Sequence, residues 1–118
     1  MWNKFKEGFI KGFVGLTIAR EMAFTGHQII LCSGRGEDTR EWTEQWLHDQ
    51  GIHWEKLYMR LANDYRGDDI VKKELLDQIV VDFGKKPDIV FDDRPRVVKM
   101  WRANGVFVAD VYQGTEDF

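Results

Sequence analysis

The chain has 118 residues, of which 43 % are hydrophobic and 14 % aromatic, enough for one domain with a substantial core. Its formal net charge of −3 excludes a globally basic nucleic-acid-binding surface, so a polyanion would have to meet a local cluster of arginines. The single cysteine, Cys32, excludes an intrachain disulfide, and no apolar run approaches the roughly 18 residues of a membrane span. We expect a soluble, cytoplasmic, single-domain protein over residues 1–118, with an N-terminal helix over 1–25 and a core over 26–118.

The N-terminal segment predicts a helix from residue 4 to about residue 25. Apolar side chains recur there at intervals of three and four, at Phe5, Phe9, Phe13, Leu16, Ala19 and Ala23. Glycines weaken the pattern, which leaves Phe13–Ile18 open as a strand instead. Gly26 is expected to end the helix in the left-handed conformation.

Strands and helices alternate through the rest of the chain. Apolar runs of strand length occupy 28–32, 56–60, 89–91 and 106–111, and helical patterns occupy 39–50, 68–83 and 95–104. The side chains expected to face the core from the three helices are Trp42, Trp46 and Leu47, then Ile70, Val71, Leu75, Ile79 and Phe83, then Val97, Val98 and Trp101. The alternation predicts an α/β fold in which helices cover both faces of a parallel sheet.

Two adjacent carboxylates, Asp92 and Asp93, directly follow the apolar run 89–91. Ligands of open α/β sheets bind beyond the carboxyl ends of the strands, where these residues are expected to lie. Two neighbouring acids repel each other unless a cation is close, and Mg²⁺ prefers oxygen ligands. The pair therefore favours a divalent metal site, and an acidic turn is the alternative.

Two further polar groups are expected at the same edge of the sheet. Ser33 and Gly34 follow the run 28–32, where a hydroxyl and backbone N–H groups can form a phosphate cradle; an ordinary capped turn is the alternative. Asp68 and Lys72 lie four apart on one helix face, so they either form an ordinary ion pair or aim the ammonium group at a phosphate.

Several arginines are candidates for phosphate recognition, because a guanidinium group matches phosphate oxygens. The set comprises Arg40, Arg60, Arg66, Arg94, Arg96 and Arg102. Arg60 and Arg66 lie near a strand end and Arg94 lies beside the acid pair, so we expect these three to contact substrate. Cys32 lies within an apolar run and is expected to be a buried, unreactive thiol.

Taken in order, four segments of the chain form a recognisable set: 30–35, 68–74, 90–94 and 97–102. They read Ile-Leu-Cys-Ser-Gly-Arg, Asp-Asp-Ile-Val-Lys-Lys-Glu, Val-Phe-Asp-Asp-Arg and Val-Val-Lys-Met-Trp-Arg. This set resembles the phosphatase domain of phage polynucleotide kinase-phosphatases, in the haloacid dehalogenase-like superfamily. The resemblance extends from about Gly26 to Phe118.

The resemblance implies a three-layer, Rossmann-like core and a Mg²⁺-dependent phosphatase of nucleic acid repair, phage or bacterial in type. The reaction would be hydrolysis of 3′-phosphomonoesters at nucleic acid ends through an aspartyl-phosphate. Asp92 and Asp93 would hold the metal. The partners implied are nucleic acid 3′-phosphate ends and a kinase domain.

The resemblance also assigns roles to the residues around the phosphate. Ser33 would hydrogen-bond the transferring phosphoryl group, with Arg35 nearby as a substrate contact. Lys72 would neutralise phosphate charge and hold the nucleophile, and Asp68 would orient this lysine. Positioning and electrostatic stabilisation carry most of such chemistry.

One part of the family pattern is absent from the sequence. The family nucleophile is the first Asp of an Asp-x-Asp-Gly signature, on a strand that lies between the strands ending at Cys32 and Phe91. The sequence contains no Asp-x-Asp. Because covalent catalysis needs this nucleophile, we expect the chain by itself to be catalytically incomplete.

Four arrangements would account for the absent strand. The chain is a fragment or begins at a late start codon; a second copy or another protein supplies the strand; Phe13–Ile18 fills the slot; or the two flanking strands pair directly. We expect an oligomer or a repacked sheet rather than an empty slot. The alternative functions are a pseudo-phosphatase that binds nucleic acid ends or a protein partner, and an oligomerising assembly module.

Overall fold

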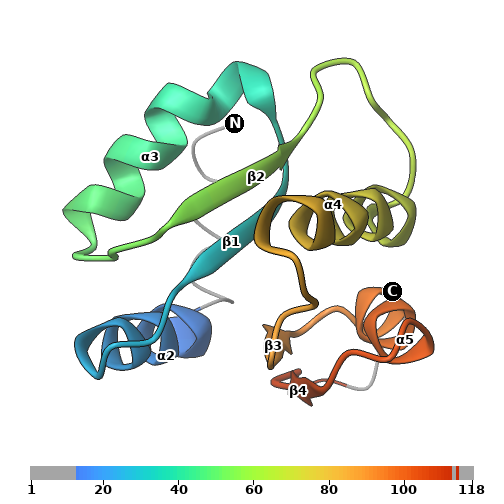
Figure 1. The fold of residues 1–118 in the computed structure, drawn as a ribbon. Helices are drawn as coiled ribbons and strands as arrows, with labels where there is room; N and C mark the ends of the chain where they lie inside the picture. The colour runs from blue at the N-terminus through green and yellow to red at the C-terminus, as the bar shows by residue number, and fades with distance from the viewer. Residues whose placement is uncertain (1–12, 113, 115–118) are drawn as a thin grey trace.

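The computed structural model describes residues 13–112 and 114, and Figure 1 shows their arrangement. The chain alternates between helices and strands as the sequence predicts. In order, the elements are α2 (Phe13–Phe24), β1 (Ile30–Gly36), the 3₁₀ turn η1 (Glu37–Thr39), α3 (Arg40–Asp49), β2 (Lys56–Arg60), α4 (Asp68–Phe83), β3 (Val90–Asp92), α5 (Pro95–Ala103) and β4 (Val108–Asp110). Among the described residues, no helix is long and apolar enough to cross a membrane.

The strands of the described residues form two parallel pairs rather than one sheet. β1 pairs with β2, with Leu31 opposite Leu57, and β3 pairs with β4, with Val90 opposite Val108. Within the described part of the chain, β1 and β3 do not hydrogen-bond to each other, and the two pairs stand apart in Figure 1. The sequence left open that β1 and β3, the strands on either side of the absent strand, pair directly. The structure shows that they do not.

The strand pair β1–β2 is unevenly buried. Leu57, Tyr58 and Met59 of β2 are buried, whereas every residue of the apolar strand β1 is only partly buried. In a parallel sheet covered on both faces, an interior strand is normally the most buried. The lower burial of β1 indicates that, within residues 13–112, no strand lies beside β1 on the side opposite β2.

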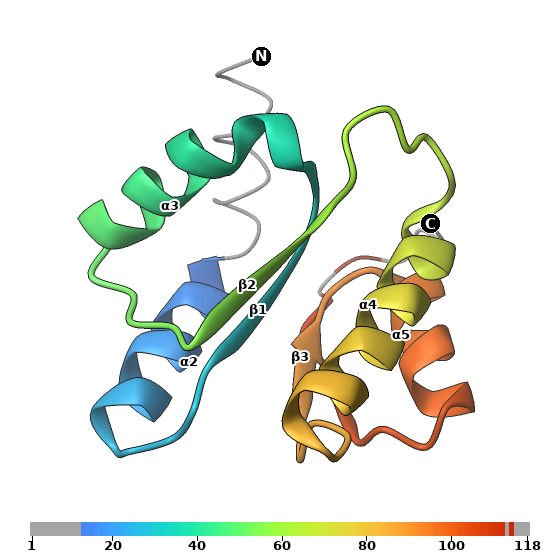
Figure 2. The same ribbon diagram turned by 45° about the horizontal axis from the view of Figure 1, so that its top comes forward.

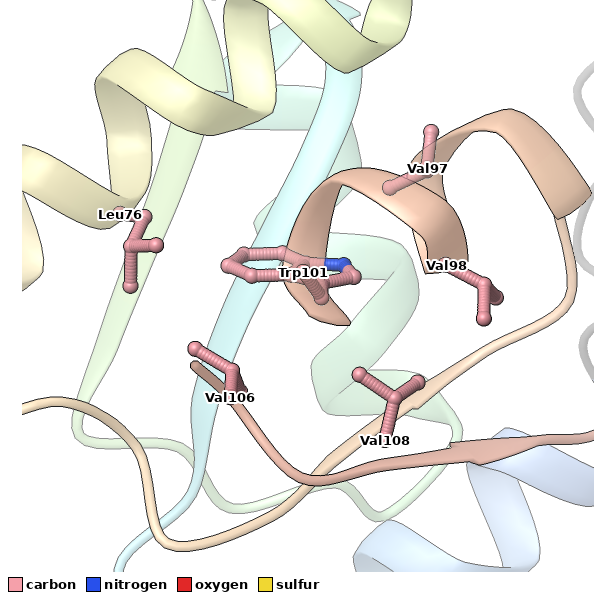
Figure 3. Packing of buried hydrophobic residues seen from close by; sticks show 6 residues of the cluster. All are labelled: Leu76, Val97, Val98, Trp101, Val106 and Val108. Atoms are coloured by element: carbon pink, nitrogen blue, oxygen red, sulfur yellow. The ribbon is translucent and has the colours of Figure 1, made fainter. Parts of the chain in front are cut away.

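Each strand pair has its own hydrophobic core. In Figure 3 the indole of Trp101 lies at the centre of a cluster from α4, α5 and the segment leading into β4, which comprises Leu76, Val97, Val98, Trp101, Val106 and Val108. A second cluster joins α3 to β2 through Leu47, Ile52, Leu57 and Met59, with Ala19 of α2 and Trp46 packed against it. The three predicted core residues of α5 are thus confirmed.

Helix α4 has the predicted bounds, and its core face agrees with the prediction at Val71 and Ile79 but not at Ile70. It begins at Asp68 and ends before Gly84, which adopts a φ of 75° that glycine tolerates best. Its buried residues are Val71, Leu76 and Ile79. Ile70, predicted to face the core, is 48 % exposed, because the packing of α5 against the neighbouring face selects Leu76 instead.

The core face of α3 is rotated relative to the prediction. Thr43 and Leu47, four residues apart on one face, are buried, and Trp46 packs against the second cluster. Trp42 was predicted to point inward and is 39 % exposed. Consecutive residues of a helix are rotated by about 100°, so Trp42 lies at the edge of the buried face that contains Thr43 and Leu47.

The N-terminal helix is confirmed over its described part. Phe13–Phe24 is helical, so the alternative of a strand over 13–18 is wrong, and this segment does not fill the slot beside β1. Gly26 follows with a φ of 92°, as predicted for the helix end. The predicted helical residues before 13, including Phe5 and Phe9, lie outside the described residues.

Candidate functional site

The site lies where the ends of β1, β2 and β3 meet the first turn of α4. The chain segments that converge there are far apart in sequence. Arg60 of β2 contacts Gly34 and Asp68, and Arg94, which follows β3, also contacts Asp68. The polar residues that follow different strands are thus brought to one edge, as the sequence predicts.

Asp68 is a bridge between two arginines. Its Oδ1 accepts a hydrogen bond from Arg60 Nη2 at 2.6 Å, and its Oδ2 accepts one from Arg94 Nη1 at 2.6 Å. Only 16 % of the Asp68 side chain is exposed, so these charge-assisted bonds are well shielded from water. The spacing of Asp68 and Lys72 suggested an ion pair between them, but the described residues show none. The Asp68 carboxylate instead connects the end of β2 to the segment after β3.

Asp92 receives three hydrogen-bond donors. Lys72 Nζ lies 3.4 Å from its Oδ2, the indole Nε1 of Trp101 lies 3.1 Å from the same oxygen, and the backbone N–H of Arg94 donates to Oδ1 at 3.2 Å. The Lys72 and Asp92 side chains are 13 % and 9 % exposed. Lys72 therefore points into the site, whereas the next residue, Lys73, turns outward to pair with Asp77.

The tryptophan was missed as a site residue, because the sequence marked it only as a core side chain. The signal that could have revealed it is its N–H group. A buried indole N–H needs an acceptor, and the nearest strand end offers a carboxylate.

Asp92 and Asp93 supply carboxylate oxygens, the ligands that Mg²⁺ prefers, but two carboxylates are few for a magnesium site. Among the described residues, no three His, Cys, Asp or Glu side chains group together in a way that could hold a metal. Both oxygens of Asp92 also accept hydrogen bonds already. The described residues therefore do not by themselves fit a magnesium site, and a further carboxylate would be needed to complete it.

Strand β1 carries the serine and glycine of the expected phosphate cradle. The strand does not end at Cys32 as predicted but continues to Gly36, with a shift of register between Ser33, opposite Met59, and Gly36, opposite Arg60. The backbone N–H of Arg35 donates to Ser33 Oγ at 3.1 Å. Because that hydroxyl accepts this bond, its own hydrogen remains able to donate to a phosphoryl oxygen.

Gly34 permits the close approach that the sequence led us to expect. A Cβ atom at this position would collide with the carboxylate of Asp68. Glycine is thus required where β1 passes the first turn of α4. Below this point, burial raises the pKa of the Cys32 thiol to about 12 although Lys72 lowers it, so the thiol is protonated and unreactive, as predicted.

Arg60 braces the site and is mostly occupied. Its Nε donates to Gly34 O at 2.8 Å, Nη1 donates to Asp64 O and Arg66 O, and Nη2 binds Asp68. The side chain is 14 % exposed. These bonds leave little of the guanidinium for the substrate contact that we expected from the sequence.

The other arginines differ in their placement. Arg94 lies in the site and is 43 % exposed, and burial lowers the pKa of the Arg35 guanidinium at the end of β1. Arg66 stands outside, where it pairs with Asp64 and Glu74. The structure thus brings Arg94 to Asp68 within the candidate site but keeps Arg66 on the loop beyond it.

Comparison with known proteins identifies a family and a fold to which the chain is similar. The sequence matches the model of the polynucleotide kinase PNKP phosphatase domain over residues 2–118. Two solved structures, described as a Pnkp1/Rnl/Hen1 complex and as the Pnkp1/Rnl/Hen1 RNA repair complex, each contain a chain that is 32 % identical with a TM-score of 0.72. The matches cover 86 % of this chain but 35 % and 32 % of those chains, so it spans about a third of their length.

Proposed function

Because this chain belongs to the family of polynucleotide kinase phosphatase domains, we propose that it binds 3′-phosphorylated ends of nucleic acids during RNA repair. We propose further that it hydrolyses the phosphomonoester only when a strand carrying the Asp-x-Asp nucleophile is supplied. The observation that carries the proposal is the pairing of Lys72 with Asp92 beside the Asp68–Arg94 ion pair at the end of β1. Two cationic groups therefore lie beside β1, the strand that carries Ser33. Phosphate recognition requires such a combination.

Each of these groups has a defined part in the proposed chemistry. Lys72 neutralises phosphoryl charge, and because its side chain is only 13 % exposed, water screens its ammonium less than that of a surface lysine. Ser33 donates a hydrogen bond to a phosphoryl oxygen. Arg94 keeps one face open to substrate while Asp68 fixes its orientation, so Asp68 is a positioning residue.

The nucleophile has to come from a strand that this sequence does not contain. We propose that the strand enters beside β1, from a second copy, another protein or another segment. The partial burial of β1 and its pairing with β2 alone support this position. A carboxylate on that strand would also add the donor that Asp92 and Asp93 lack for Mg²⁺.

Binding of 3′-phosphorylated RNA tests the recognition part directly. Single-stranded RNA with a 3′-phosphate is expected to bind the chain at least tenfold more tightly than the same strand with a 3′-hydroxyl. Lys72→Met should abolish this difference, whereas Lys73→Met, its outward-facing neighbour, should preserve it. Equal affinity for the two strands in the parent chain would contradict the proposal.

A non-catalytic binding protein is the second candidate, because both oxygens of Asp92 are held by protein donors. It predicts phosphate-dependent binding with no turnover even after an Asp-x-Asp strand is supplied. Self-association through the uncovered side of β1 is the third. Sedimentation of the chain as a monomer over a wide concentration range would remove that candidate.

A further inference from the structure

An open hollow of about 520 Å³ lies on the loop between β2 and α4. Figure 2 shows this loop arching away from the helices beyond the end of β1. The residues that line this hollow include Gly36, Asp38, Arg60, Asn63, Tyr65 and Arg66. Gly36 directly follows Arg35, so the hollow begins where the phosphate-binding end of β1 stops.

The loop is held in place without any help from Tyr65. Arg60 donates to the backbone carbonyls of Asp64 and Arg66. The Asp64 carboxylate in turn accepts from the backbone N–H of Arg66 at 3.2 Å and from its Nη2 at 2.7 Å. Asn63 adopts a φ of 67°, which fixes a tight turn at the crest. Tyr65 therefore lies on a loop whose backbone is fixed by hydrogen bonds.

Tyr65 presents its ring to solvent. The residue is 89 % exposed, and among the described residues its hydroxyl contacts Asn63 Oδ1 alone, at 3.5 Å. A ring of this size gains about 1.5–3 kcal/mol when it is buried, so leaving it in water forgoes that stabilisation. An exposed aromatic ring on a rigid loop is suited to receive a planar ligand.

The charges of the hollow select the kind of ligand. Arg60 is paired with Asp68, and Arg66 is paired with Asp64 and Glu74, so the arginines there are neutralised and do not form a second phosphate site. Asp38 is exposed, and within the described residues it has no hydrogen-bond or ion-pair partner. The hollow thus offers a ring face and a free carboxylate, which match a flat group that carries N–H donors.

We propose that this hollow binds a nucleobase of a single-stranded nucleic acid, stacked on Tyr65 with an N–H edge directed at Asp38. The inference rests on the proposed function, because the phosphate-binding end of β1 adjoins the hollow through Gly36. A 3′-phosphorylated end held at Ser33 then places its terminal base at Tyr65. Stacking of this kind tolerates any base, and Asp38 adds a preference for bases that donate hydrogen bonds.

The test separates the base from the phosphate with four single-stranded RNAs. The terminal nucleotide either carries 2-aminopurine or is abasic, and each form either has or lacks a 3′-phosphate. Tyr65→Ala is expected to weaken binding of both base-bearing strands by about 5- to 150-fold, the equivalent of one stacked base at about 1–3 kcal/mol. It should leave the abasic strands unchanged, and Tyr65→Trp should restore binding and quenching of the 2-aminopurine fluorescence.

Phe24→Ala is the matched control, because Phe24 is equally exposed, at 89 %, at the end of α2. It should leave all four affinities unchanged. Equal losses on base-bearing and abasic strands, no loss on either, or no binding of any strand by the parent chain would overturn the nucleobase site. If removal of the base weakens binding and removal of the 3′-phosphate does not, the nucleobase site stands and the proposed function is contradicted. If removal of the 3′-phosphate weakens binding and removal of the base does not, the proposed function stands and the nucleobase site is contradicted.

Discussion

Trp101 donates its indole N–H to Asp92 Oδ2 at 3.1 Å, the oxygen that Lys72 Nζ approaches at 3.4 Å. The tryptophan is 2 % exposed at the centre of the core beneath α4 and α5, as Figure 3 shows. The carboxylate at the end of β3 is thus oriented by the hydrophobic core itself. Core packing and site geometry in this half of the molecule are therefore coupled.

The coupling makes Trp101→Phe a sensitive variant. Phenylalanine keeps most of the buried ring but removes a hydrogen bond to a charged group, for which we expect a loss of about 1.5–3 kcal/mol in the free energy of unfolding. Urea unfolding measures this loss. Phe107→Leu, at a residue 70 % exposed, is the control and should change stability by less than about 0.5 kcal/mol. An equally small change at Trp101 would show that the bond to Asp92 does not contribute.

Gly34→Ala tests the close approach of β1 to α4. The added methyl group would collide with the Asp68 carboxylate, so we expect a destabilisation of about 1–3 kcal/mol. In an Asp68→Ala background the collision disappears, and the same change should cost much less. Additive effects of the two substitutions in a double-mutant cycle would contradict the proposed contact.

Arg60→Lys tests whether Arg60 acts as a brace. Lysine keeps the charge but cannot reach Gly34, Asp68 and the loop carbonyls together, so a loss of about 1–3 kcal/mol is expected, with faster hydrogen exchange over 61–67. Arg66→Lys is the matched control, because the Arg66 side chain is 47 % exposed and its ion pairs should contribute less than about 1 kcal/mol. A larger effect at Arg66 than at Arg60 would argue against the brace.

The acid dependence of stability should involve Asp82. The hydroxyl of Tyr58 donates to Asp82 Oδ2 at 2.6 Å, and with Gln78 and Lys56 it lowers the pKa of this carboxyl to about 2. The charged form is thus favoured in the folded chain. Its contribution is present above about pH 4, the ordinary range of an aspartate, and is lost as the pH falls toward 2.

Thermal unfolding between pH 2 and pH 6 measures this contribution. Asp82→Asn is expected to lower the midpoint at pH 6 and to flatten its fall below pH 4. Tyr58→Phe removes the strongest of the three donors and should reproduce part of that change. A parent-like acid slope in Asp82→Asn would contradict the assignment.

Much of the fold could be predicted because its signals are local. The bounds of α4 follow from its apolar spacing and Gly84, and the first turn of α5 follows from Pro95. The exposure of Trp42 could not, because it depends on which surfaces meet in three dimensions. Local patterns do not contain that information. The division into two strand pairs falls where the family strand is absent, between the strands β1 and β3, but the repacked sheet that we considered for closing this slot is not seen among the described residues.

In the candidate site, too, local features could be predicted and contacts between distant residues could not. That only one of Lys72 and Lys73 points inward follows from their separation of about 100° around the helix, but the spacing does not say which one. The partners of Asp68 do not follow from the sequence, because Arg60 and Arg94 lie 8 and 26 residues away in sequence and only the fold brings them together. The brace formed by Arg60 was hidden for the same reason.

The most direct test supplies the strand that the sequence lacks. An apolar strand ending in Asp-x-Asp-Gly is fused before residue 1 through a flexible linker, and phosphate release from 3′-phosphorylated RNA is measured with Mg²⁺. We expect no release from the chain alone, release from the fusion, and loss of release when the first Asp of the added strand, Asp92 or Asp93 is changed to Asn. Release by the chain alone that survives Asp92→Asn and Asp93→Asn, or a folded fusion without activity, would contradict the account.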